Sequence, residues 1–210
     1  MSPCQCQSPL TKRGHERHEK ILEAAGEVFA EQGYAGASIN EIVKRSGGSL
    51  GTVYKFFGNK LGLFEAFFQK ATCEVFSQFH AEDFWSDDIE ASLYKFGNEL
   101  QKLMLKPDAL SVYRLVLNDN SGDRAEIQRI FMENGPHKIT GYLACFFRQQ
   151  QEKGRIQLED VDIAAYQFID MVKGPMHFKA LFGAEIDREI CEKTLKQAVK
   201  IFLKGAKPCQ

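Results

Sequence analysis

Two adjacent glycines, Gly47 and Gly48, separate two short segments that each carry apolar residues at helical spacing. The first segment begins at Ser38 and the second at Ser49, and serine is a preferred N-cap residue of a helix. Glycine accepts a positive φ without steric cost, so the pair allows a tight turn. The sequence therefore predicts two short helices joined by a tight turn in this part of the chain.

A longer helix is predicted before this pair. Its periodicity begins near Arg17 and stops at Gly33, with an apolar stripe formed by Ile21, Ala25, Val28 and Phe29. After the glycine turn, Val53 and either Phe56 or Phe57 would face the preceding helices. Three helices, of which the last two are joined by a tight turn, predict a helix-turn-helix whose final helix can enter the major groove of DNA.

The charge distribution favours a nucleic-acid partner for this end of the chain. The net charge is −1, but residues 1–60 carry +2 and residues 61–210 carry −3. No acidic residue lies between Glu41 and Glu65, a region that contains Lys44, Arg45, Lys55 and Lys60. Asn59 can cap the next helix, and a lysine just inside its first turn could hold a phosphate together with the helix N-terminus.

The rest of the chain is predicted to be helical, because it shows neither strand alternation nor repeats. Glycine, proline and paired aspartates mark the breaks between helices. Gly174-Pro175 lies inside a predicted helix, where proline either kinks or interrupts it. The fold class is therefore all-α with about nine or ten helices, and the predicted later helices are residues 60–80, 88–105, 108–118, 123–134, 137–153, 160–182 and 187–204.

Residues 38–60, SINEIVKRSGGSLGTVYKFFGNK, resemble the DNA-binding signature of TetR/AcrR-type bacterial transcriptional regulators. The matching features are a preceding helix that ends FAEQGY, a capping serine, a Gly-Thr-aliphatic-Tyr-x-x-Phe recognition helix and a lysine that opens the fourth helix. The rest of the chain agrees only in length and helical character. The resemblance implies a disordered leader at 1–14, a helix-turn-helix DNA-binding domain at 15–58, and a ligand-binding and dimerisation domain at 59–205.

The resemblance also implies roles for single residues. Tyr54 and Lys60 would be phosphate anchors, and Ser38 a contact at the start of the second helix. We add Arg45 from the basic segment to this DNA-binding set. The residues implied to face the groove are Ser49, Leu50, Gly51, Thr52 and Lys55.

Two positions depart from the family pattern. Position 48 usually carries valine or a similar apolar residue, and Gly48 loosens the packing of the turn. Position 50 is often polar or basic, whereas Leu50 has no hydrogen-bonding group and could only touch a thymine methyl. The base read at that point therefore does not follow from the family pattern.

The resemblance implies a homodimer on a palindromic operator in double-stranded DNA, with recognition helices roughly 34–36 Å apart. The last two predicted helices carry apolar stripes that could pair with their copies in a four-helix bundle. The same stripes could instead belong to the intramolecular core. The candidate interface residues are Phe168, Val172, Leu195, Ala198 and Phe202.

The resemblance further implies a repressor that leaves its operator when a small apolar ligand fills the C-terminal core and shifts the fourth helix. Aromatic residues at helical spacing are more often core than pocket. Arg114 could pair with an acidic ligand, pair with a carboxylate of the chain or extend to solvent. The candidate ligand-binding residues are Phe96, Leu100, Tyr113, Arg114, Leu117, Phe131, Tyr142, Phe146 and Phe168.

An enzyme is not expected, and neither is a metal or a cofactor. Residues 15–18 are His-Glu-Arg-His, one residue short of H-E-x-x-H, and no third ligand lies nearby. The chain has no apolar run long enough for a signal peptide or a membrane span, so we expect a cytoplasmic protein without a membrane partner.

Two alternative modes of control remain open. In one, a protein partner docks on the C-terminal helices; in the other, cysteine oxidation controls DNA binding. The six cysteines are scattered in a chain that is large enough not to need disulfides, so reduced thiols are expected. The C-x-C pair in the leader is not expected to bind metal, and the candidate sensor thiols are Cys73, Cys145 and Cys191.

Overall fold

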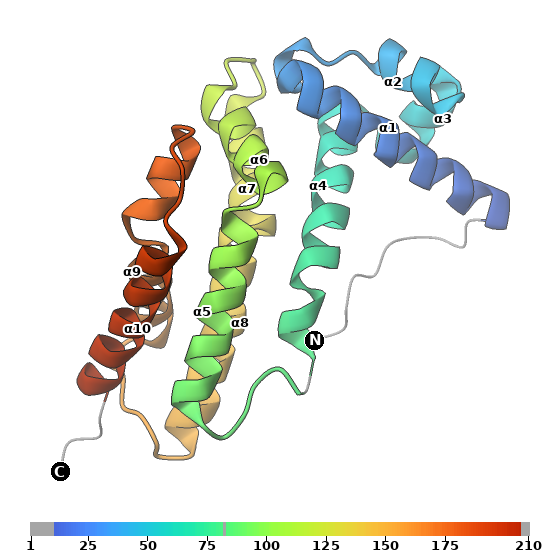
Figure 1. The fold of residues 1–210 in the computed structure, drawn as a ribbon. Helices are drawn as coiled ribbons and strands as arrows, with labels where there is room; N and C mark the ends of the chain where they lie inside the picture. The colour runs from blue at the N-terminus through green and yellow to red at the C-terminus, as the bar shows by residue number, and fades with distance from the viewer. Residues whose placement is uncertain (1–10, 82, 207–210) are drawn as a thin grey trace. The chain divides into compact units, whose positions relative to one another are not determined.

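The computed structural model describes residues 11–81 and 83–206, and this part of the chain contains helices and no strand (Figure 1). The all-α class predicted from the sequence is therefore confirmed. The elements are α1 (Lys12–Gly36), α2 (Ile39–Ser46), α3 (Leu50–Phe57), α4 (Lys60–Phe76), the 3₁₀ turn η1 (Ser77–His80), α5 (Ile89–Met104), α6 (Pro107–Asn118), α7 (Arg124–Asn134), α8 (Pro136–Glu152), α9 (Val161–Leu181) and α10 (Arg188–Gly205).

The chain divides into two compact units. Unit 1 comprises Met1–Glu74 and Arg114–Asn134, and unit 2 comprises Val75–Tyr113 and Gly135–Gln210. Unit 1 continues past residue 58, the predicted end of the DNA-binding domain, because it includes α4 up to Glu74 and also α7.

The start of α1 corrects the predicted leader. The helix begins at Lys12 rather than near Arg17, because the Thr11 hydroxyl accepts a hydrogen bond from the Gly14 amide at 3.2 Å and caps it. Residues 12–14 are therefore helical, while residues 1–10 and their C-x-C pair lie outside the described residues. Gly33 ends the regular part of α1 as predicted, with a φ of 69°.

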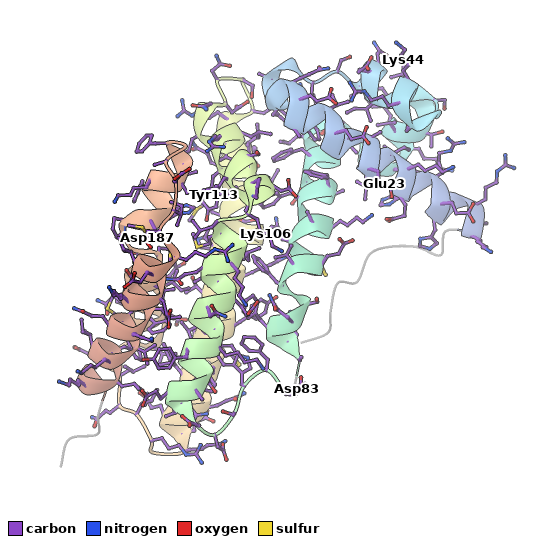
Figure 2. All side chains as sticks on the ribbon, in the orientation of Figure 1. Glu23, Lys44, Asp83, Lys106, Tyr113 and Asp187 are labelled. Carbon is purple, nitrogen blue, oxygen red and sulfur yellow. The ribbon has the colours of Figure 1, made fainter. Side chains whose placement is uncertain are left out.

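The core of unit 1 is aromatic. Phe29 of α1 and Tyr34, which follows the Gly33 turn, pack against Phe64 of α4 with ring centroids 5.3 and 5.4 Å apart. Phe68, one turn further along α4, packs against Phe131 of α7 at 5.7 Å. Glu23 of α1 and Lys44 of α2, both labelled in Figure 2, are exposed. The short helices α2 and α3 are thus held on a rigid base.

Unit 2 is a bundle in which α9 packs on α8 and α10, and α10 packs on α5. Its core stacks Trp85 on Phe146 at a centroid distance of 4.5 Å. At Gly97, α5 and α10 approach so closely that an added Cβ would lie 2.3 Å from Leu195 Cδ1. This tight bundle leaves little free space between its helices.

Pro175 kinks α9 rather than ending it. Gly174 takes φ 51° and ψ −161°, which leaves the helical region, and the helix resumes after it. The Gln101 side-chain amide of α5 donates to the carbonyls of Val172 and Cys191, each at 3.0 Å. Gln101 therefore links the kink in α9 to α5 and α10.

Most predicted helix ends agree with the structure within a residue, because N-cap side chains mark them. The carboxylates of Asp88, Asp160 and Asp187 accept backbone N–H groups at the starts of α5, α9 and α10. The exception is the segment predicted as a helix over 60–80, in which α4 stops at Phe76 and a 3₁₀ turn follows. Among residues 11–81 and 83–206, none of the helices combines the length and apolarity that a membrane span requires.

Candidate nucleic-acid interface

The short helix α3 exposes the side chains that were predicted to face DNA. Ser49 caps it, because its Oγ accepts the Thr52 amide at 3.2 Å. Leu50 and Tyr54 are 43% and 50% exposed, which is high for large side chains and fits a contact surface. The predicted groove-facing residues are exposed or half-buried in every case: Ser49, Leu50, Gly51, Thr52 and Lys55.

The opposite side of α3 is buried in unit 1. Val53 is fully buried and Phe57 is 9% exposed, so Phe57 is the more buried of the two phenylalanines, and Phe56 also packs against His18 of α1 at a centroid distance of 5.6 Å. His18 of α1 packs against Phe57 with ring centroids 4.8 Å apart, and burial lowers the pKa of this histidine. This packing determines which side of α3 remains exposed and available for contact with DNA.

In the turn between α2 and α3, only one of the two glycines adopts the left-handed backbone conformation. Gly47 has a φ of 67°, whereas Gly48 does not have a positive φ, which corrects the role expected for it. Arg17 of α1 donates to the carbonyls of Ser46 at 3.2 Å and Gly47 at 2.8 Å. A cation is favourable at a helix C-terminus, so Arg17 stabilises the turn. No motif in the sequence singles out this residue, because its partners come from another helix.

Arg45 is part of an ion cluster within unit 1. Its guanidinium makes two bonds to Glu31 of α1, at 2.8 and 2.7 Å, and one to Glu41 at 3.0 Å. Glu27 lies 3.9 Å away. The hydrogen bonds that Arg45 donates to Glu31 and then to Glu41 raise the pKa of Arg45. The structure thus gives Arg45 partners within unit 1, and its predicted DNA contact stays a prediction.

Lys60 lies at the start of α4, as predicted, and Asn59 caps this helix by accepting the Gly62 amide at 2.8 Å. The Lys60 ammonium donates to the carbonyl of Ala35 at 3.3 Å and lies 4.5 Å from the Tyr34 ring centroid. Burial lowers the pKa of Lys60, and two nearby aspartates oppose this effect. Its ammonium is therefore held against the end of α1.

The loop between α6 and α7 carries those aspartates. Asp123 accepts a hydrogen bond from the Tyr34 hydroxyl at 2.6 Å, which joins this loop to the end of α1. Burial, followed by this bond, raises the pKa of Tyr34. Asp119 is 5% exposed and its Oδ2 accepts from Ser121 at 2.7 Å. A polar network in unit 1 thus surrounds the Lys60 side chain.

Ser38, the remaining residue of the predicted DNA-binding set, is exposed and caps α2. Its Oγ accepts the Asn40 amide at 3.2 Å, as an N-cap should. The Glu41 carboxylate, three residues further on, accepts a hydrogen bond from Arg45. Ser38, Tyr54 and the residues of α3 are therefore exposed, while Arg45 and Lys60 have partners in their own chain.

The predicted ligand-binding residues are divided between the two units. Phe96, Leu100, Phe146 and Phe168 are buried in the core of unit 2, where Tyr113 and Tyr142 pack beside them. Arg114, Leu117 and Phe131 belong to unit 1, and Leu117 is 60% exposed, so it does not line a buried pocket.

The predicted dimer interface is also corrected. The structure buries its residues against their own chain, with exposures of 8% or less: Phe168, Val172, Leu195, Ala198 and Phe202. Other apolar side chains of α9 and α10 lie on the surface, with exposures from 40% to 87%: Ile163, Tyr166, Phe178, Phe182, Ile190 and Ile201. We call this second set the exposed apolar surface.

No group of three or more histidine, cysteine, aspartate or glutamate side chains is arranged for a metal ion within residues 11–81 and 83–206. His15 is exposed on α1, while His18 packs into unit 1. The two histidines of the near-match to H-E-x-x-H therefore lie in different environments.

Two family models match the chain. The one described as bacterial regulatory proteins, tetR family, matches residues 21–67, which include α2 and α3. The other, described as AefR-like transcriptional repressor, C-terminal domain, matches residues 91–205, from α5 to α10.

Curated relatives are transcriptional regulators of the helix-turn-helix type. YvdT of Bacillus subtilis is 37% identical over 82 residues, which are 37% of this chain and 42% of YvdT. The chain also covers only 26% of YxaF from the same organism. YvkB, again from B. subtilis, is 24% identical over 90% of this chain and 96% of its own length.

Solved structures share the fold along nearly the whole chain. A TetR-family regulator from Mesorhizobium loti has a TM-score of 0.80 at 24% identity, covering 94% of this chain and 100% of that one. The flavonoid-responsive regulator FrrA has a TM-score of 0.80 at 23% identity, covering 93% and 100%. The fold and its exposed recognition helix define a transcriptional regulator with a helix-turn-helix DNA-binding domain. The chain belongs to the TetR family.

Proposed function

We propose that this TetR-family protein is a homodimeric repressor that binds a palindromic operator and leaves it when a small apolar molecule binds in unit 2. The observation that carries the proposal is the arrangement of α3: Val53 is fully buried while Tyr54 is 50% exposed. A helix fixed on one side and open on the other is what insertion into a major groove requires. The repressor role follows the description of the C-terminal family model.

The proposed DNA contacts are of two kinds. Tyr54 and Lys60 would bind phosphates, and the α4 N-terminus beside Lys60 adds backbone N–H groups that favour the same anion. Leu50, with 43% exposure, would touch a thymine methyl in the groove. Lys60 must exchange its bond to the Ala35 carbonyl for a phosphate, so its contribution to affinity is smaller than that of an unengaged lysine.

The proposed dimer uses the exposed apolar surface of α9 and α10. Phe178 and Phe182 are 65% and 87% exposed, and large apolar side chains this accessible mark an interaction surface. We expect Phe178→Glu to shift the protein from dimer to monomer in sedimentation velocity. Leu117→Glu, at an exposed leucine of unit 1, is the control. A monomeric parent, or a dimer that persists in Phe178→Glu, would refute this arrangement.

A small-molecule effector is proposed because the names of two relatives indicate control by a ligand. These relatives are FrrA, called flavonoid-responsive, and the A-factor receptor protein of Streptomyces griseus, which is 27% identical over 69% of this chain and 48% of its own length. We place the protein in the cytoplasm, where its DNA would be. A coupling free energy of about 1–3 kcal/mol between effector and operator would change DNA affinity 5- to 150-fold.

Fluorescence anisotropy on DNA from the protein's own promoter region tests the function. Across a salt series, removal of one phosphate contact should reduce the slope of log affinity against log salt by about 0.9. We expect this reduction in Lys60→Ala, which removes a positive charge, whereas Tyr54→Phe removes only a neutral hydroxyl and should lower the affinity without changing the slope. Lys106→Ala, which changes an exposed lysine of unit 2, should match the parent. Absence of specific binding by the parent would refute the proposal.

A further inference from the structure

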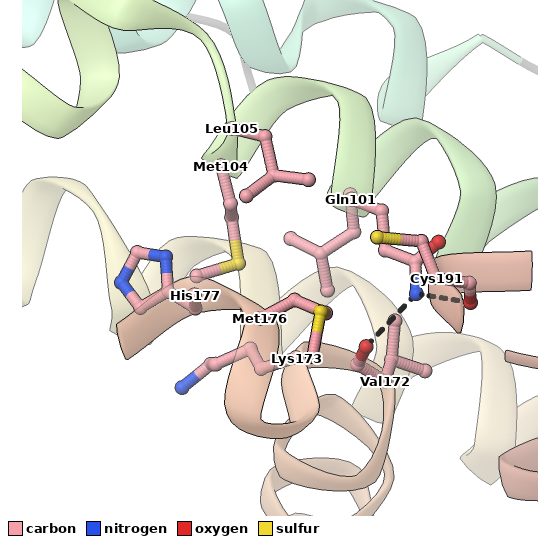
Figure 3. Close-up of a pocket in the computed structure, with 9 residues that line it drawn as sticks. Gln101, Met104, Leu105, Val172, Lys173, Met176, His177 and Cys191 are labelled. Carbon is pink, nitrogen blue, oxygen red and sulfur yellow. Dashed lines mark hydrogen bonds between the residues drawn. The ribbon is translucent and has the colours of Figure 1, made fainter. Parts of the chain in front are cut away.

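A small cavity lies in unit 2 at the kink of α9 (Figure 3). Its volume is about 10 Å³, which is room for about one water molecule. Three helices form its walls: the end of α5, the kink of α9 and the first turn of α10. The side chains that line it include Met104, Lys173, Met176 and His177.

His177 presents an unpaired polar atom at this cavity. The residue is 7% exposed, and its Nδ1 is buried without a hydrogen-bond partner in the described structure. The Tyr113 ring packs edge-on against it, with centroids 4.6 Å apart. A buried polar atom without a partner costs stability, so its presence in a native fold calls for an explanation. A ligand that supplies the missing partner would provide one.

The chemistry of that partner follows from the imidazole. Burial, and then the charge of Lys173, lower the pKa of His177, so the ring is neutral at neutral pH. A neutral imidazole has one N–H and one bare nitrogen. A hydroxyl group can donate or accept, and it therefore satisfies Nδ1 in either tautomer. The remaining walls of the cavity are mostly apolar, so the rest of the ligand must be apolar as well.

The cavity is closed by side chains that can move. Met104 and Met176 are 7% and 5% exposed, and methionine adapts its shape more readily than other apolar residues. Gly174 beside them has a backbone conformation outside the helical region. The segment of α9 beyond this glycine carries Phe178 and Phe182 of the exposed apolar surface. A change at the cavity is thus joined to that surface by one helical segment.

We propose that this cavity is the effector site and that it takes a small apolar molecule with one hydroxyl group, which displaces Met104 and Met176 and hydrogen-bonds to His177 Nδ1. The proposal rests on the ligand-responsive function proposed above. Binding opens the cavity and changes the bend of α9 at Gly174. The dimer contact proposed for Phe178 and Phe182 then changes its geometry, and with it the spacing of the two recognition helices.

Phenol and toluene test the site, because they share a ring and differ in the hydroxyl group. Each is titrated into the full chain while the ¹H–¹³C resonance of the Met176 methyl group, which lines the cavity and is kept in every variant, is followed by NMR. A single hydrogen bond corresponds to about a ten-fold preference for phenol in the parent. His177→Leu should abolish this preference and leave toluene binding unchanged. His137→Leu, at an exposed histidine of α8, is the matched control and should keep the preference.

A second variant keeps the test valid if His177→Leu does not fold. Met104→Ala enlarges the cavity, and we expect both probes to bind several-fold more tightly to it. The proposal is overturned if neither probe binds the parent and Met104→Ala, if the parent prefers toluene, or if His177→Leu retains the preference; the cavity then holds water only. Binding of the ligand-free protein to its operator is measured in a separate experiment. If the protein does not bind the operator, the proposed function is refuted, whereas the binding of phenol in the cavity is still tested by the titration.

Discussion

Gly62→Ala is expected to displace the recognition helix from its support. A Cβ added at Gly62 would lie 2.1 Å from the carbonyl oxygen of Phe57, the last residue of α3. Carbon and oxygen atoms in close contact are about 3.3 Å apart. The obstacle is a backbone atom, which cannot rotate away as a side chain could. α3 and α4 must therefore separate by about 1 Å.

The size of the effect follows from two opposing contributions. Forcing an extra methyl group into a packed position costs about 1–3 kcal/mol, and a rigid backbone obstacle places this case at about 3 kcal/mol. Alanine in a helix is about 1 kcal/mol more favourable than glycine. The free energy of unfolding should thus fall by about 2 kcal/mol, which lowers Tm by about 4–8 °C in a chain of this length.

Thermal unfolding and operator anisotropy measure the two consequences. We expect the Tm decrease together with an affinity decrease of at least about ten-fold, equivalent to the removal of one phosphate contact of about 1.4 kcal/mol. Gly141→Ala in α8 is the control, because its added Cβ would meet no atom within 4 Å. It should raise stability by up to about 1 kcal/mol and leave operator binding unchanged.

The result that would refute this reasoning is a Gly62→Ala protein with the Tm and operator affinity of the parent. Such a protein would show that α3 and α4 do not meet at the distance found here. A Tm decrease without any decrease in operator affinity would mean that α3 moves together with α4 and keeps its orientation.

Three further expectations concern unit 2. Gln101→Leu removes two hydrogen bonds of 3.0 Å and should lower the free energy of unfolding in urea by about 2 kcal/mol, whereas Gln197→Leu at an exposed position should not. Because the pKa of His177 lies below its ordinary value of 6.5, the unfolded chain binds more protons below pH 6.5. Urea stability should therefore fall as the pH decreases from 6.5, and fall less steeply in His177→Leu. Iodoacetamide should label the exposed Cys145 first and Cys191 last, since burial raises the pKa of the Cys191 thiol; fast labelling of Cys191 with loss of operator binding would favour cysteine-based control.

Residues close to one another in the sequence were sufficient to predict the recognition helix α3 and most helix ends. Ser49 and Asn59 act as caps through their own side chains, which bond backbone amides three residues ahead. Such bonds depend on neighbours in the sequence, so they can be predicted without the fold. Val53 was likewise predicted to be buried from its position in a short amphipathic helix.

Charges whose partners come from another helix could not be predicted in this way. Arg45 has the sequence context of a phosphate contact, but Glu31 of α1 reaches it only after α1 and α2 have packed. Lys60 was placed correctly at the start of α4, whereas its contacts with Tyr34 and Ala35 depend on the turn at Gly33. Sequence gives the position of a charge along the chain, and tertiary packing decides what neutralises it.

The dimer residues illustrate a different limit. An apolar stripe has the same spacing whether it faces its own core or a second copy. α9 carries both kinds: Phe168 is buried in unit 2, while Phe178, ten positions further along the chain, is 65% exposed. The sequence alone did not separate the two sets, and the kink at Gly174 lies between them.

The ion cluster around Arg45 affects how this protein meets DNA in solution. Three carboxylates, those of Glu27, Glu31 and Glu41, lie around one guanidinium, so the cluster itself carries more negative than positive charge. DNA that approaches from this side is repelled over about 8–10 Å at physiological salt. Collisions in the wrong orientation are therefore short-lived, and the cluster favours the encounters in which α3 already faces the groove.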